Sequence, residues 1–73
     1  MFERFELQQL ALLACNGGGF TVSANRFNLQ DLSTLAANAS SGKASLKISD
    51  TDHLSFQDLN FIAGRGEGAV EFI

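Results

Sequence analysis

The chain of 73 residues contains an internal repeat, and this repeat constrains the fold more than any other feature. Three segments align without gaps, and each contains a Gln-Gln-Leu or Gln-Asp-Leu core flanked by apolar residues. They occupy residues 5–14, 27–36 and 54–63. The cores are separated by distances in the range of about 20 to 50 residues that is typical of stacked supersecondary units.

The repeated segments are predicted to form amphipathic helices. In the second segment, Leu29, Leu32 and Leu35 recur at three-residue spacing, which places them on one face of an α-helix. The third segment carries an apolar stripe composed of Phe56, Leu59, Ile62 and Ala63. These stripes, with Leu32 and Leu59 at equivalent places, are expected to form the hydrophobic core.

Helix starts are marked in the second and third segments. Asn28 and Ser55 are good N-cap residues, and each is followed three positions later by an aspartate, as in a capping box. The equivalent residue of the first segment, Glu6, is a poor cap. We therefore expect the first helix to begin earlier, near Phe2.

Each helical segment is followed by a glycine- or serine-rich stop and then by a short alternating run. The stops occupy residues 16–19, 38–42 and 64–68. Glycine after the last periodic residue is typical of a helix end. Alternation of apolar and polar residues then predicts strands at 20–23, 46–49 and 70–73. The predicted order of elements is αβαβαβ.

Strands joined through a helix are normally parallel and connected by right-handed crossovers. We therefore expect an α/β fold in which three αβ repeats form a small parallel three-stranded sheet with all helices on one face, in a solenoid-like arrangement. A chain of this length is too short for two cores, so residues 1–73 should form a single domain. The other face of the sheet should be open to water. The polar residues predicted on that face are Thr21, Ser23, Lys47, Ser49 and Glu71.

The chain resembles the longer, helix-bearing leucine-rich repeats. Residues 20–27 fit the strand pattern apolar-x-apolar-x-x-Asn-x-apolar, with Asn25 at the asparagine position. Residues 46–54 fit it with Thr51 at that position and one extra residue before the closing leucine. The resemblance implies an arc whose exposed strand face binds other proteins.

Composition excludes several classes of function. A net charge of −3 with only five Lys and Arg residues disfavours a phosphate-binding surface, and hence direct binding to nucleic acid. One Cys and one His exclude a structural zinc site and an intrachain disulfide. Residues 10–15 look like a lipoprotein cleavage site, but acidic residues precede them and the apolar run is shorter than the roughly 7 to 15 residues of a signal core. We expect a cytoplasmic protein that does not contact a membrane.

Three further motifs have local structural interpretations. The glycines at 64, 66 and 68 follow a helix and precede a strand, the reverse of a phosphate-binding loop, so a helix-ending turn is expected. The acidic segment around His53 lacks the central glycine and the terminal glutamate of a calcium-binding loop, which favours a solvated turn. Cys15 at a helix end is expected to be a buried, inert thiol. We therefore predict no catalytic residues, no metal and no cofactor.

The repeat, together with the lack of a recognisable catalytic cluster, predicts a non-enzymatic protein-interaction module. Its binding surface would be the open sheet face and an acidic rim, formed by Arg26, Asp50 and Asp52, where strands lead into helices. Phe61 lies off the main helical stripe and is predicted to be an exposed contact residue. The chain ends on an apolar edge strand, which predicts self-association, as a homodimer, through this strand or the helix face.

A second interpretation is a small acidic inhibitor or immunity-type protein. Such a protein would block a target enzyme or a nucleic-acid-binding complex, as a phage anti-defence protein, an anti-CRISPR-like protein or a toxin antagonist does. The small size and negative charge motivate this alternative, which is an analogy of size and charge alone. Its partner, too, would be another protein.

Overall fold

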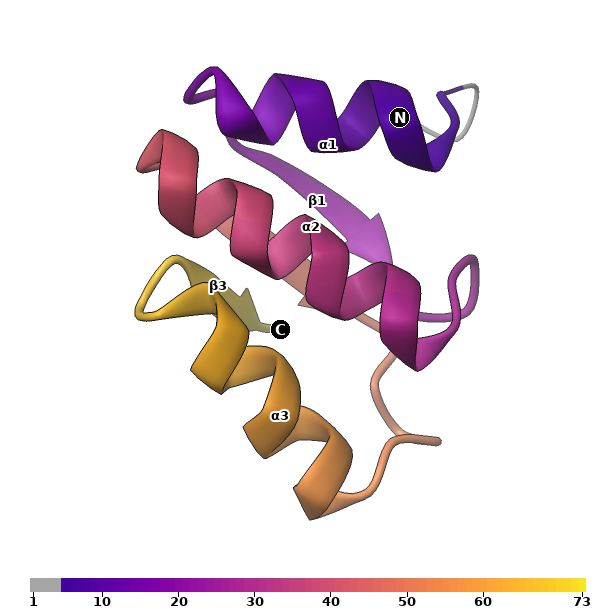
Figure 1. Cartoon of the computed structure of the whole chain (residues 1–73). Coiled ribbons are helices and arrows are strands. Elements are labelled where there is room, and N and C mark those ends of the chain that lie inside the picture. Colours follow the sequence, from indigo (N-terminus) through magenta and orange to yellow (C-terminus); the bar gives the residue numbers. More distant parts are fainter. Residues whose placement is uncertain (1–4) are drawn as a thin grey trace.

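The computed structural model describes residues 5–73 and has the predicted order of elements, αβαβαβ. The elements are α1 (Leu7–Cys15), β1 (Phe20–Ser23), α2 (Leu29–Gly42), β2 (Leu46–Ser49), α3 (Phe56–Gly66) and β3 (Val70–Phe72). The helices form one layer and the strands lie behind them (Figure 1). In the described part of the chain, no helix has the length and apolar character needed to cross a membrane.

The strands form a three-stranded sheet in the order β1-β2-β3, and both pairs are parallel. Phe20, Leu46 and Val70 lie in register across the sheet, and so do Thr21, Lys47 and Glu71 one residue later. The prediction of a small parallel sheet in a mixed α/β fold is confirmed. Consecutive repeats therefore place equivalent strand residues next to each other.

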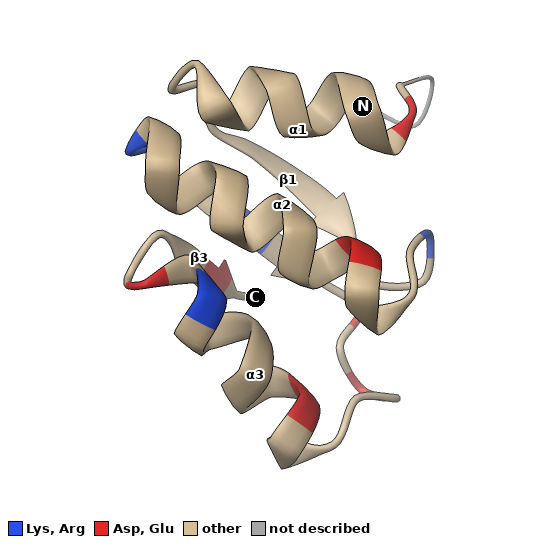
Figure 2. Cartoon of the chain, viewed as in Figure 1, with Lys and Arg blue, Asp and Glu red and all other residues tan. Residues whose placement is uncertain are grey.

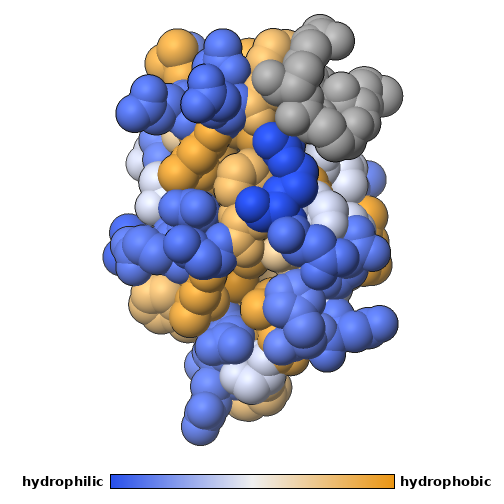
Figure 3. Space-filling view, turned by 90° about the vertical axis from the view of Figure 1, so that its right-hand side faces the viewer, coloured by the Kyte–Doolittle hydropathy of each residue, from blue (hydrophilic) through white to orange (hydrophobic). Residues whose placement is uncertain are grey.

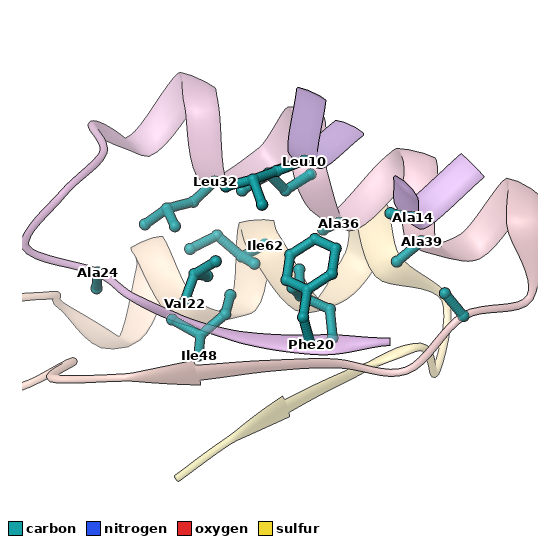
Figure 4. Close-up of a cluster of buried hydrophobic side chains, with 13 residues drawn as sticks. Leu10, Ala14, Phe20, Val22, Ala24, Leu32, Ala36, Ala39, Ile48 and Ile62 are labelled. Carbon is teal, nitrogen blue, oxygen red and sulfur yellow. The ribbon is translucent and has the colours of Figure 1, made fainter. Parts of the chain in front are cut away.

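The hydrophobic core fills the space between the helix layer and the inner face of the sheet (Figure 4). Alternate strand residues point into it, and the helices contribute leucines and alanines from the opposite side. The largest fully buried apolar side chains are Leu10, Leu32, Leu35, Leu46, Ile48 and Ile62. Leu32 and Leu35 of the predicted stripe of the second repeat are thus confirmed as core, and Leu29 is half-buried against them.

The predicted stripe of the third repeat is only partly correct. Ile62 is fully buried, but Leu59 is half-buried, Ala63 is exposed and Phe56 is 79% exposed. The cause is the position of α3 at the end of the helix layer, where α2 contacts it on one flank only. An amphipathic pattern marks a face, but burial of that face requires a neighbour.

Two of the three helix starts follow the prediction. The Asp31 backbone N–H donates to Asn28 Oδ1 at 2.8 Å, and Ser55 and Asp58 form a reciprocal capping box. The first helix begins at Leu7, so the expected earlier start near Phe2 is wrong, and Phe2 itself lies outside the described residues. The Glu6 backbone N–H donates to Gln9 Oε1 at 2.9 Å, which satisfies this donor without a further helical turn.

Two of the three predicted helix stops are wrong. α1 ends before its glycine run as expected, but α2 and α3 continue through theirs to Gly42 and Gly66. A Cβ on Gly42 would meet the carbonyl oxygens of Ala14 and Cys15, and one on Gly66 would lie 3.2 Å from the Cβ of Val70. These glycines are therefore required for close packing of the helix ends.

The residues that end α2 and α3 are not glycines. Lys43 and Glu67 occupy the left-handed region, with φ of 58° and 48°. A residue with a Cβ pays roughly 1–2 kcal/mol in that region, which glycine avoids. Lys43→Gly is therefore expected to raise the free energy of unfolding by about 0.5–1 kcal/mol, measured by urea denaturation.

Lys43→Ala is the matched control for this substitution. Alanine removes the same charge but keeps the Cβ, so it should give no comparable gain. An equal gain from Lys43→Ala would show that loss of the lysine charge is responsible.

The expectation for Cys15 is also wrong, because the structure places this cysteine on the surface. It is the last residue of α1, which forms the other end of the helix layer. Ala14, one residue earlier, is the residue of that turn that enters the core.

Candidate functional site: the open sheet face

The side of the sheet that faces away from the helices carries a row of exposed side chains. Thr21, Lys47 and Glu71 are in register on the three neighbouring strands, and all three are exposed. Neighbouring strands of a sheet are about 4.8 Å apart, so these side chains lie close together on a flat surface. We call this surface, with Ser23 and Ser49, the open sheet face. The predicted alignment of its residues is confirmed.

An uncovered face is unusual for a parallel sheet, because helices normally cover both faces. Here the core residues of β1 and β2 all point to the helix side, and polar residues occupy the alternate positions. The open sheet face therefore displays side chains from a rigid, hydrogen-bonded backbone.

Ser23 and Ser49, the second row of the open sheet face, are half-buried and bind a carboxylate. Ser23 Oγ donates to Asp50 Oδ2 at 2.7 Å, and Ser49 Oγ is 3.3 Å from the same oxygen. Asp50 itself has a positive φ of 58°. This aspartate was predicted as a rim charge, but the structure shows that it links the ends of β1 and β2.

Asp50 and Asp52 are therefore expected to respond differently to the same substitution. Asp50→Lys removes both serine contacts and places a long side chain at a positive φ, which should lower the free energy of unfolding by about 1–2 kcal/mol. Asp52→Lys, at an exposed turn position, should change it by less than about 0.5 kcal/mol. Thermal denaturation followed by circular dichroism measures both, and equal losses would contradict a structural role for Asp50.

Arg26, the third predicted rim residue, is anchored to the rest of the chain. Its Nη2 donates to the carbonyl oxygen of Phe5 at 2.7 Å, and its guanidinium carbon lies 4.7 Å from the centroid of the Phe27 ring. A residue held by a hydrogen bond and a cation–π contact presents its charge in a defined position. Arg26 thus joins the segment before α1 to the loop after β1.

The rim where β1 and β2 end also contains apolar residues, in addition to the predicted charges. Phe5, Phe27 and Leu54 are equivalent residues of the three repeats, and each is half-buried against the core. Figure 3 shows this side of the molecule, where hydrophobic atoms are visible between hydrophilic side chains. The rim therefore combines apolar surface with the exposed charge of Asp52.

A hollow of about 360 Å³ adjoins the open sheet face at the other end of the strands. It is lined by Gly19, Phe20, Thr21, Ser45 and Lys47. Gly19 allows a close approach here, because a Cβ would lie only 2.7 Å from the carbonyl oxygen of Ser45. Sequence reasoning missed Gly19 and Ser45, since both lie in turns and neither carries a distinctive side chain.

Phe61 is exposed as predicted, but it does not belong to the open sheet face. It lies on α3, in the helix layer on the opposite side of the sheet. The nine predicted contact residues are thus distributed over three places: the open sheet face, the rim and the helix layer.

Metal-binding chemistry finds no support among residues 5–73, where no three His, Cys, Asp or Glu side chains are grouped in a way that could hold an ion. His53 and Asp52 are both exposed in the turn before α3. Comparisons with models of protein families, with curated proteins and with solved structures find no match to this chain.

Proposed function

We propose that the chain is a non-enzymatic protein-interaction module that binds its partner through the open sheet face. The observation that carries the proposal is the exposed, in-register row of Thr21, Lys47 and Glu71 on a parallel sheet that the helices of residues 5–73 cover on one face only. The backbone of paired strands is already ordered, so binding costs little backbone conformational entropy. This favours recognition by side chains on the sheet.

The proposal includes a solenoid-like arrangement of the three repeats. Its support is the sheet order, which follows the chain order, and the contacts of each helix with the next one along the chain. In such an arrangement each repeat adds one strand to a continuous binding surface. This is the kind of surface that the resemblance to leucine-rich repeats implies.

The chemistry of the open sheet face indicates the kind of partner. Lys47 is the central cation of the face and also lines the neighbouring hollow. A carboxylate side chain of a partner could enter this hollow and contact the Lys47 ammonium group. The partner is therefore a protein that presents an acidic side chain on a surface flat enough to cover three strands.

Lys47→Glu is expected to weaken binding to this partner by tenfold or more, about 1.4 kcal/mol or above, because the new carboxylate would repel the acidic side chain. The partner is first isolated from the native host with the tagged chain and identified, and its dissociation constant is then measured by calorimetry. Circular dichroism verifies that the variant is folded.

Arg65→Glu is the control, because it makes the same change of charge on α3 in the helix layer (Figure 2). It should leave the dissociation constant within about twofold of the wild-type value. If Phe61→Asp abolishes binding while Lys47→Glu has no effect, the partner binds the helix layer and the proposal is wrong.

A further inference from the structure

The middle repeat has a neighbour on both flanks, and its apolar helix positions are covered. Leu35 and Ala36 are fully buried, and Leu29 is half-buried. The equivalent positions of the first and third repeats differ from these in a regular way. The differences show which positions contact the preceding helix and which contact the following one.

Leu13, Leu35 and Ile62 are equivalent residues of α1, α2 and α3. Leu35 and Ile62 are fully buried, whereas Leu13 is 40% exposed. α2 and α3 each contact a helix that precedes them in the chain, and α1 has no preceding helix in residues 5–73. This position therefore contacts the preceding repeat, and in α1 it lacks that contact.

Ala14, Ala36 and Ala63 show the opposite pattern. The first two are buried, whereas Ala63 is exposed, as is Phe56 about two helical turns earlier in α3. A Cβ on Gly66 of α3 would lie 3.6 Å from the Ala36 Cβ, so the alanine position is where a following helix approaches. In α3 this position has no following helix to contact.

The two outer edges of the sheet are also complementary, because the hydrogen-bond pattern between neighbouring strands can be repeated between them. The Phe20 backbone N–H donates to the Ser45 carbonyl at 3.3 Å, and the Leu46 N–H donates to the Ala69 carbonyl at 2.7 Å. Val70 is the residue of β3 that is equivalent to Phe20 and Leu46, so its N–H is the corresponding donor. Within residues 5–73, β3 has no further strand beside it. The equivalent acceptor, the residue before Phe20, is Gly19.

We propose that the α3–β3 end of one copy docks onto the α1–β1 end of a second copy, which continues both the parallel sheet and the helix layer. Val70 N–H of one copy would donate to the Gly19 carbonyl of the other, and Ala63 and Phe56 would cover Leu13. This inference goes beyond the proposed function. The docking ends do not include Lys47, although Gly19 and Thr21 also line the hollow beside it, and the sedimentation experiment measures self-association and not partner binding.

A second copy is the occupant that fits, because both ends reproduce surfaces that already contact each other inside the chain. α1 contacts α2 and α2 contacts α3, and in each pair the alanine position of the earlier helix and the Leu35 or Ile62 position of the later helix are buried. α1 also carries no charged residue, so it offers no repulsion to Glu67 and Glu71 at the other end (Figure 2). Since the two ends differ, the assembly is head-to-tail and grows beyond a dimer or closes into a ring.

The experiment blocks one end at a time and follows mass by sedimentation velocity from micromolar to millimolar concentration. The wild-type chain should form dimers and larger species as concentration rises. Ala63→Arg blocks the α3–β3 end, and Leu13→Arg blocks the α1–β1 end. Each variant alone should be monomeric, but an equimolar mixture should form a one-to-one dimer through the two remaining ends.

Ser41→Arg adds the same charge at an exposed position of the middle repeat and should self-associate like the wild type. If Leu13→Arg does not fold, Thr21→Pro replaces it. Proline at this position removes a backbone N–H on the side of β1 away from β2, which the docked copy would need but the sheet within the chain does not use. A wild-type chain that stays monomeric at millimolar concentration overturns the proposal. So does a single-end variant that still dimerises alone, because that result indicates a symmetric interface.

Discussion

Leu32→Ala is expected to lower the free energy of unfolding by about 2–5 kcal/mol. Leu32 is fully buried in α2, the central helix, and it contributes to the core between the helix layer and the sheet. Truncation removes apolar contacts and leaves a cavity that helices on both flanks cannot easily close. For a chain of this size, with a total stability on the order of 5 kcal/mol, the loss is a large fraction.

Urea denaturation followed by far-ultraviolet circular dichroism measures this loss, since the chain has neither Trp nor Tyr as a fluorescent probe. Leu59→Ala is the matched comparison, because Leu59 is the equivalent residue of the third repeat but is only half-buried. By sequence alone, the two leucines occupy equivalent core positions. The structure predicts a smaller loss for Leu59→Ala, about 1–2 kcal/mol, and equal losses would contradict the assigned burial.

Gly42→Ala is expected to lower the free energy of unfolding by about 3 kcal/mol or more. The added Cβ would meet the carbonyl oxygens of Ala14 and Cys15, which are backbone atoms at the end of α1. A side chain can rotate away from a new methyl group, but a backbone carbonyl can move only with its helix. The substitution should therefore separate the ends of α1 and α2.

Gly64→Ala is the control for this effect of close packing. Gly64 lies inside α3, and a Cβ there would have no atom within 4 Å. Because alanine favours a helix interior over glycine, Gly64→Ala should raise the free energy of unfolding by about 0.5–1 kcal/mol. If both glycine substitutions stabilise the chain, the close approach of α1 and α2 is wrong.

Much of the fold follows from local sequence patterns. Alternation in residues 20–23 and 46–49 predicted the strands and the direction of their side chains, and the structure confirms both. Asn28 and Ser55 predicted two helix starts, because capping is a contact between residues three positions apart. The exposure of Thr21, Lys47 and Glu71 followed in the same way from alternation and parallel pairing.

The candidate site was less predictable than the fold. Asp50 was predicted as a rim charge, but it accepts a hydrogen bond from Ser23, which is 27 residues away. Arg26 likewise donates to the carbonyl of Phe5, which is 21 residues earlier in the chain. Such contacts join different repeats, so no local pattern of residue types indicates them.

The sequence by itself determined the order of the elements and which strand residues face the helices, because each depends on residues close together in the chain. The parallel direction of the strands followed from the repeat, since strands joined through a helix normally run the same way. Only the tertiary structure decided where α2 and α3 end, since Gly42 and Gly66 are helical where neighbouring elements approach too closely for a Cβ. It also decided that Leu35 is buried while Leu13, its equivalent, is exposed. The physical reason is that an apolar side chain is buried only where another element covers it. Within residues 5–73, each end repeat has a neighbour on one flank only.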